Sequence, residues 1–154
     1  RRAALQVADR AMIVPDVNLL LYAELDAFTQ HDRARVWWES LLGGDRSVGL
    51  APVSVFGFLR ISTNRKVFSE PLAMTDAIER VESWLQQPCA TFLVPGPLHL
   101  ATAFRLLKQI GTGGNLTTDV QLAAHAIEHG GELHSNDTDF ARFEGLRWVN
   151  PIAG

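Results

Sequence analysis

Short apolar runs alternate with longer segments that carry a helical apolar stripe, and this alternation constrains the fold more than any other feature of the chain. The segment 31–42, for example, places Ala34, Trp37, Trp38 and Leu41 at i, i+3, i+4 and i+7, the spacing of one helix face. Strands that alternate with helices are typical of a largely parallel sheet covered on both faces. Right-handed crossovers between the strands then predict a three-layer α/β/α sandwich.

The bounds of the expected elements follow from the same pattern, with proline and glycine at several boundaries. Strands are predicted at 12–14, 47–50, 91–94, 132–135 and 146–149. Helices are predicted at 17–25, 31–42, 53–63, 74–86 and 100–110, and from 117 or 118 to the glycine pair at 130–131. A short helical turn is expected at 138–143, and a flexible loop at 111–114. We therefore expect a single domain at 12–151, after an extension at 1–11 whose role stays open.

Length and composition predict one compact domain without a membrane anchor. The chain has 154 residues, enough for one domain with a core and too few for two ordinary ones. No apolar run approaches the roughly 20 residues of a membrane helix, and the first residues lack an apolar signal core. The single cysteine, Cys89, excludes an internal disulfide and a multi-cysteine zinc site. Its lone occurrence fits a reducing compartment, so a cytoplasmic location is expected.

Four aspartates follow predicted strands or begin predicted helices. Asp16 comes directly after the first strand, and Asp119 lies in the first turn of the helix after the glycine loop. Asp137 and Asp139 follow the fourth strand. Ligands of open parallel sheets bind at the carboxyl ends of the strands. We therefore expect these carboxylates to share one cleft at that edge.

A cluster of carboxylates predicts a hard divalent cation. Like charges a few ångströms apart repel each other and raise each other's pKa, and a bound cation relieves this repulsion. Mg²⁺ and Mn²⁺ prefer oxygen ligands and keep bound waters for a phosphate substrate. Such an ion activates a water, neutralises phosphoryl oxygens and stabilises a leaving alkoxide. The pattern thus favours metal-dependent hydrolysis of a phosphate ester.

Each candidate also has a purely structural explanation. Asp16 and Asp119 are typical N-cap or first-turn acids, and Asp139 is expected to cap the turn that follows it. His125 and His129 have metal-ligand spacing, but no third ligand is evident, and they are read as a polar helix face. Trp37 and Trp38 are read as core residues. The net charge of −3 does not indicate a nucleic-acid binder, so any polyanion must meet a local basic patch or metal ions.

Three motifs together resemble the PIN domain, and more narrowly the VapC-type toxins of bacterial toxin–antitoxin pairs. The first is Asp16-Val17-Asn18, after the first strand. The others are NLTTDVQLAA at 115–124 and SNDTDFARF at 135–143, followed by LRWVNP at 146–151. The resemblance covers 12–151. It implies a Mg²⁺-dependent endoribonuclease, usually a homodimer, that a cognate VapB-type antitoxin keeps silent.

Under this hypothesis Asp16 and Asp119 bind Mg²⁺, Asp137 contacts the ion directly or through water, and Asp139 supports the set. The metal-bound water attacks a phosphodiester in single-stranded or looped RNA. Polar side chains near the acids orient water or phosphate, and basic residues around the end of the third helix form a rim around the cleft. The polar side chains are Asn18, Ser135 and Asn136, and the basic residues are Arg60, Arg65 and Lys66. The alternative is that Arg60 pairs with an acid of the cluster and that Lys66 belongs to a solvated face.

One position departs from the family pattern. The family's usual second acid is a glutamate on the helix after the second strand, and Gly57 stands at that place. Glu24 and Glu39 are conceivable substitutes. The departure favours an alternative function, a PIN-like binding module that contacts an antitoxin but does not cut RNA. A receiver-type phosphotransfer protein would need a strand-end lysine opposite the acids, and neither Lys66 nor Lys108 is so placed.

Overall fold

A parallel five-stranded sheet forms the centre of the molecule, described by a computed structural model over residues 11–111, 114 and 116–153. The strands are β1 (Ile13–Pro15), β2 (Val48–Leu50), β3 (Ala90–Phe92), β4 (Glu132–His134) and β5 (Arg147–Val149). Their spatial order is β3-β2-β1-β4-β5, and every neighbouring pair is parallel. The predicted extension at 1–11, apart from Ala11, lies outside the described residues, as do two residues of the predicted loop at 111–114.

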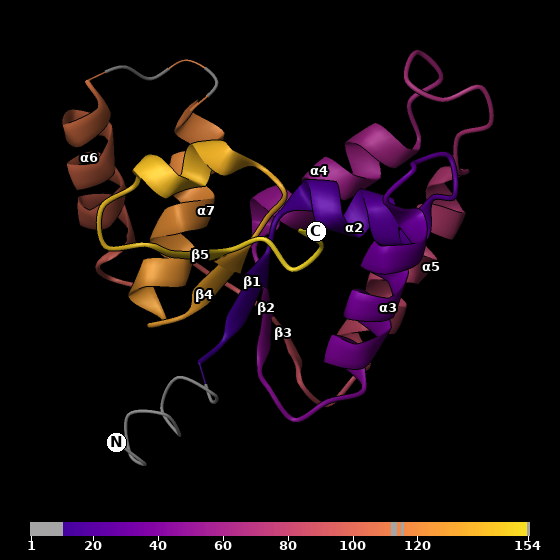
Figure 1. Ribbon diagram of the computed structural model, residues 1–154, viewed down its shortest axis with the longest axis horizontal. Helices are drawn as coiled ribbons and strands as arrows, with labels where there is room; N and C mark the ends of the chain where they lie inside the picture. Colours follow the sequence, from indigo (N-terminus) through magenta and orange to yellow (C-terminus); the bar gives the residue numbers. More distant parts are fainter. Residues whose placement is uncertain (1–10, 112–113, 115, 154) are drawn as a thin grey trace.

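Six α-helices and one 3₁₀ helix connect these strands within the described residues (Figure 1). They are α2 (Val17–Glu24), α3 (His31–Leu42), α4 (Pro52–Ser62), α5 (Met74–Leu85), α6 (His99–Ile110), α7 (Leu116–Glu128) and η1 (Thr138–Arg142). Every predicted element has a counterpart whose ends lie within two residues of the expected ones. No helix in the described part of the chain is long and apolar enough to cross a bilayer.

The helices form two layers, one on each face of the sheet (Figure 1). Helices α2 to α5 enclose one core, in which Trp38, Phe58 and Trp84 are buried and their rings meet edge to face. Helices α6 and α7, with η1, cover the other face around a second core that includes Leu106 and Phe140. The three-layer α/β/α sandwich expected from the sequence is confirmed, and so is the core position of Trp38.

The turn between α7 and β4 fixes where β4 lies beside β1. Gly130 adopts a positive φ of 61° as α7 ends, a conformation that glycine takes at little cost. A Cβ at Gly131 would lie 2.6 Å from the carbonyl oxygen of Met12, so only glycine allows this close approach. The pairing that follows matches Ile13 with Glu132 and Pro15 with His134.

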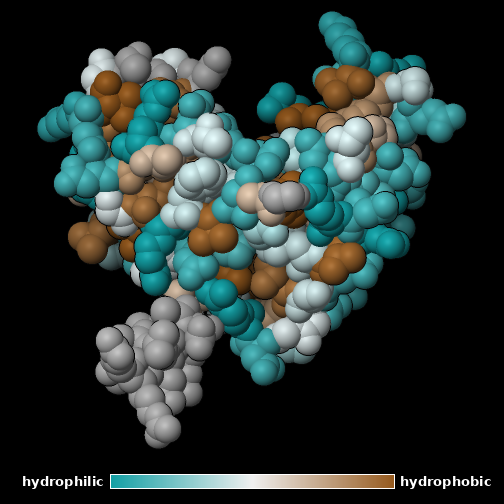
Figure 2. Space-filling view, in the orientation of Figure 1, coloured by the Kyte–Doolittle hydropathy of each residue, from teal (hydrophilic) through white to brown (hydrophobic). Residues whose placement is uncertain are grey.

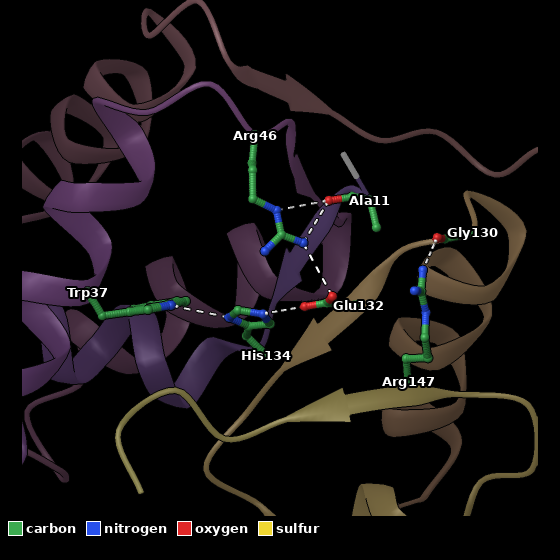
Figure 3. A network of polar contacts seen from close by, with 7 residues as sticks. All are labelled: Ala11, Trp37, Arg46, Gly130, Glu132, His134 and Arg147. Carbon is green, nitrogen blue, oxygen red and sulfur yellow. Dashed lines mark hydrogen bonds and ion pairs between the residues drawn. The ribbon is translucent and has the colours of Figure 1, made fainter. Parts of the chain in front are cut away.

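A chain of polar contacts ties α3 to β4 across one face of the sheet (Figure 3). The Trp37 indole Nε1 donates to His134 Nδ1 at 3.2 Å, and His134 Nε2 lies 3.2 Å from Glu132 Oε1. Glu132 also pairs with Arg46 at 3.3 Å, and Arg46 donates to the carbonyl oxygen of Ala11. An indole can only donate, so the His134 proton lies on Nε2. Burial lowers the pKa of His134, which keeps this imidazole neutral.

Candidate active site

The pairing of β1 with β4 brings Asp16 and Ser135 together at the carboxyl edge of the sheet. The Asp16 amide donates to the carbonyl oxygen of His134 at 2.8 Å, one residue beyond the last paired positions. The Ser135 hydroxyl then donates to Asp16 Oδ2 at 2.7 Å. In the strand order β3-β2-β1-β4-β5 the chain changes direction across the sheet at β1 and β4. This switch point is where open α/β sheets bind ligands.

Asp16 caps α2 and is buried at the base of this edge. Its Oδ1 accepts a hydrogen bond from the Val17 amide at 2.7 Å, so the predicted N-cap is confirmed. Only 9% of the residue is exposed. Burial raises the pKa of Asp16, the hydrogen bonds from Ser135 and Val17 oppose this increase, and the charge of Asp137 adds to it. The Asp16 carboxylate therefore both caps α2 and belongs to the acid cluster.

Asp119 faces the same cleft from the first turn of α7. Burial, and then the charges of Asp16, Asp137 and Asp139 in that order of effect, together raise the pKa of Asp119 to about 6. These couplings require the four carboxylates to lie near one another. The structure therefore brings together acids that are up to 123 residues apart in the chain. Figure 2 shows the surface notched above this edge, between the α6–α7 side and the α4 side.

The loop after β4 arranges the remaining two acids. Asp137 caps η1 by accepting the Asp139 amide at 2.9 Å, so the prediction that Asp139 is the cap is wrong. Asp137 has the extended backbone of an N-cap residue, whereas Asp139 lies inside the first turn. The Asp139 carboxylate is exposed and pairs with Arg142 at 3.5 Å.

Ser135 joins the two acid-bearing segments. Its hydroxyl donates to Asp16, and it accepts the Asp137 amide at 3.0 Å and the Asn18 side-chain amide at 3.4 Å. A hydroxyl has one donor and two acceptor positions, so the hydrogen-bonding capacity of Ser135 is filled. The residue is fully buried. It holds Asp16 in place and has no free donor for a phosphate.

The side-chain oxygens of Asn18 and Asn136 differ in whether they already accept a hydrogen bond. Asn18 Oδ1 is buried and has no hydrogen-bond partner among the described residues. An unpartnered buried acceptor costs free energy, and its presence beside carboxylates fits a missing donor or cation. Asn136 instead accepts a hydrogen bond from Asn150 at 3.1 Å, which fixes the loop after β4 against the chain after β5.

The acids fit a hydrated divalent cation. Among the ion pairs of the described residues, none joins a lysine or arginine to Asp16, Asp119 or Asp137. No three carboxylates of this described set come within 4.8 Å of one another. As they stand, therefore, at most two of these carboxylates can contact one ion, and waters would have to supply its other ligands. The raised pKa values and the orphaned Asn18 oxygen both point to positive charge as what the cleft accommodates.

Gly57 lies where α4 packs against the start of α2. A Cβ at this position would be 3.2 Å from Val17 Cγ2, which is tight but not a collision. A side chain at 57 would therefore lie against Val17, the residue that follows Asp16 in the chain. Glu24 does not replace the missing acid, since it pairs with Arg80 at 2.6 Å and accepts the Trp84 indole at 2.9 Å. Glu39 is exposed on α3.

The predicted basic rim is exposed. Arg60 lies in the last turn of α4, one turn beyond Gly57, and Arg65 and Lys66 lie in the loop that follows. None of them forms an ion pair with a described residue of the acid cluster. The alternative that Arg60 pairs with a cluster acid therefore does not hold in the described structure.

Sequence reasoning also missed a histidine cluster between α6 and α7. The expectation that His125 and His129 form a polar helix face is wrong for His125, which is 3% exposed. Its ring packs against that of His99, with the centroids 4.3 Å apart. The spacing of His125 and Glu128 was a usable signal, but the contribution of His99 from another helix was not visible in the sequence.

Comparison with characterised proteins identifies the family. The PIN domain family model matches residues 13–146. Ribonuclease VapC33 of Mycobacterium tuberculosis is 51% identical over 141 residues, which cover 92% of this chain and 99% of that protein. Ribonuclease VapC37 of the same species is 39% identical over 142 residues, with coverage of 92% and 99%.

Solved structures agree on the fold at much lower identity. VapBC2 from Rickettsia felis, bound to a DNA fragment from its promoter, matches with a TM-score of 0.66 and 19% identity, over 90% of this chain and 98% of that one. VapC20 of Mycobacterium tuberculosis, a toxin that cleaves the sarcin–ricin loop, matches with a TM-score of 0.61 and 14% identity, over 88% and 98%. The chain therefore belongs to the PIN domain family, among the VapC ribonucleases.

Proposed function

We propose that this protein is a metal-dependent endoribonuclease, the toxin of a VapBC-type pair, and that it hydrolyses RNA phosphodiesters in the cleft around Asp16. The observation that carries the proposal is the convergence of four carboxylates at the β1–β4 switch point of a chain that belongs to the VapC ribonucleases. In the described structure no lysine or arginine forms an ion pair with Asp16, Asp119 or Asp137.

Asp16 and Asp119 would hold the cation, Mg²⁺ or Mn²⁺, with Asp137 binding it directly or through a water. When bound, such an ion supplies a water of lowered pKa and stabilises charge on the phosphoryl oxygens. Ser135 and the Val17 amide keep the Asp16 carboxylate in one orientation. Asp139, which is exposed and paired with Arg142, would add negative charge at the rim of the cluster.

Substrate binding would use neutral and basic groups around the acids. The free Oδ1 of Asn18 lies beside Ser135 and would accept a hydrogen bond from a bound water. Asn136 would orient water or phosphate from the loop after β4. Arg60, with Arg65 and Lys66 beyond it, would contact RNA phosphates outside the cleft, and each such contact adds salt dependence to binding.

The partners follow from the relatives. Solved structures with the same fold include VapBC complexes of Rickettsia felis, and one of Salmonella typhimurium bound to DNA. A cognate VapB-type antitoxin is therefore the expected inhibitor of this chain, and a homodimer its expected assembly. A cytoplasmic location follows from the proposed RNA substrate.

The test is cleavage of a structured RNA by the purified chain under titrated Mg²⁺ or Mn²⁺, with a chelator control. Cleavage should require the ion and should be lost in Asp16→Asn and Asp119→Asn. Asp76→Asn, an exposed first-turn acid of α5, is the matched control and should cleave normally. Cleavage that persists in the chelator, or in both cleft variants, would contradict the proposal.

A second candidate, a binding module that does not cut RNA, rests on Gly57 alone, and the match to VapC ribonucleases over 92% of the chain does not favour it. Gly57 leaves the cleft without the glutamate that the family pattern expects. Intact RNA at every metal concentration, together with tight binding of the antitoxin, would support the module.

A further inference from the structure

Helices α6 and α7 meet at a cluster of potential metal ligands near the end of α7, whereas Asp119 lies in the first turn of that helix. His99 is the first residue of α6, and His125 and Glu128 lie one turn apart near the end of α7. One ligand atom from each of the three lies within 4.8 Å of the other two. Within the described residues this is the one group of three or more such side chains that meets this limit.

Both imidazoles present a buried nitrogen without a partner. His99 Nδ1 and His125 Nδ1 are inaccessible to solvent and form no hydrogen bond in the described structure. His125 is almost completely buried, and its ring lies against that of His99. Leaving a buried polar group unpaired costs about 1–3 kcal/mol, and two such nitrogens on adjacent rings require an explanation. A shared ligand between the rings supplies one.

The third side chain is held in position by the backbone. Glu128 accepts hydrogen bonds from the amides of Gly96 and Leu98, at 3.0 Å and 3.1 Å. A Cβ at Gly96 would collide with Glu128 Oε2, so the loop before α6 is built closely around this carboxylate. Supporting hydrogen bonds of this kind orient the carboxylate ligands of metal sites.

We propose that His99, His125 and Glu128 bind one divalent transition-metal ion, with Zn²⁺ the best match. Two imidazoles and a carboxylate are a ligand set of zinc, whereas Mg²⁺ prefers oxygen ligands throughout. A tetrahedral zinc with bonds of about 2.0–2.1 Å places its ligand atoms roughly 3.3 Å apart. The three ligand atoms, which lie within 4.8 Å of one another, would therefore have to approach by at most about 1.5 Å to bind the ion. A water would complete the fourth position.

This site is distinct from the acid cleft. Asp119 and His125 are six residues apart on α7, which corresponds to about 9 Å along the helix axis and about 120° around it. Paired metal ions in two-metal nucleases are about 3.5–4 Å apart, so this ion cannot be the second ion of such a centre. Its effect would instead be mechanical. It would fasten the start of α6 to the end of α7, the helix whose first turn carries Asp119.

The test is a Zn²⁺ titration of the metal-free chain by calorimetry, repeated with Co²⁺ and read by visible absorption. Wild type should bind one Zn²⁺ per chain at this site, and Co²⁺ should give the absorption of a tetrahedral site. His99→Gln and Glu128→Gln should each weaken binding by about 100-fold or more. His129→Gln, at an exposed histidine in the turn after α7, is the matched control and should bind as wild type does.

Asp16→Asn with Asp119→Asn separates the two sites. This double variant should keep the Zn²⁺ site unchanged. Loss of Zn²⁺ binding in the double variant, with retention in His99→Gln, would place the ion in the acid cleft and overturn the proposal. Absence of a saturable Zn²⁺ site in wild type would overturn it as well. Circular dichroism of each variant distinguishes the loss of a metal ligand from the loss of the fold.

Discussion

Replacing Asp119 with asparagine should stabilise the metal-free protein at neutral pH. The pKa of Asp119 is raised from 3.8 to about 6 by burial and by the neighbouring carboxylates. The charged form is therefore disfavoured in the folded state, and the folded chain binds more protons than the unfolded chain between these two values. By linkage, this group lowers the stability of the metal-free protein as the pH rises from about 4 to about 6.

The size of the effect follows from the same shift. Two pKa units correspond to about 3 kcal/mol, and solvent screening of a half-buried side chain reduces this to about 1–2 kcal/mol. For a chain of this length that is a rise in melting temperature of about 2–8 °C. The gain should be present at pH 7.5 in a chelator and should shrink at pH 5, where Asp119 is mostly protonated in the fold.

Urea denaturation in the presence of EDTA measures this directly. Added Mg²⁺ should stabilise wild type, through binding to the native state alone, and should leave Asp119→Asn unchanged. Asp76→Asn, which removes an exposed charge on α5, should behave as wild type at both pH values. A variant no more stable than wild type at pH 7.5 would refute the idea that the acids repel one another in the empty cleft.

Three further substitutions or conditions test other parts of the account. Ser135→Ala removes the hydrogen bond to Asp16 and leaves that carboxylate less ordered, so the rate of RNA cleavage should fall by about 10–100-fold, measured at saturating Mg²⁺. Gly57→Glu adds an acid beside the cleft while crowding Val17. Mg²⁺ affinity should rise, and the free energy of unfolding should fall by about 1–3 kcal/mol, with Gly57→Ala as the control for crowding alone. If Gly57→Glu binds Mg²⁺ no better than Gly57→Ala, position 57 does not face the ion. Acidification of the metal-free protein should cost stability through His125, whose pKa is lowered to about 4 by burial and by the nearby imidazoles of His99 and His129, against the opposing charge of Glu128. Because the unfolded imidazole titrates near 6.5, this loss of up to about 3 kcal/mol should develop as the pH falls from 6.5 towards 4, and His125→Gln should remove it in urea titrations.

The elements were predictable because each depends on signals within a few residues. The helix at 31–42 was expected with the bounds that α3 has, since its stripe and its terminal glycine pair are local. Helix α4 begins at Pro52, one residue before the expected start, because proline fits the first helical position. The order of strands, in contrast, depends on pairing between segments far apart in the chain, and the sequence did not reveal it.

The convergence of the acids was also predictable, because the carboxyl ends of parallel strands meet at one edge of a sheet. The hydrogen bonds that position these acids could not be predicted from the sequence. Ser135 hydrogen-bonds partners 117 and 119 residues away, and no local pattern marks such a position. The wrong cap has a similar cause, since Asp137 and Asp139 are both good caps and the backbone dihedral angles decide between them. His125 looked exposed because His99 comes from another helix.

The most direct test of the central claim is anomalous diffraction from crystals of this protein grown with Mn²⁺ as a substitute for Mg²⁺. We predict an anomalous peak bridging the carboxylates of Asp16 and Asp119, with Asp137 nearby. Full occupancy of Mn²⁺ elsewhere on the molecule, with no peak between these two acids, would contradict the account.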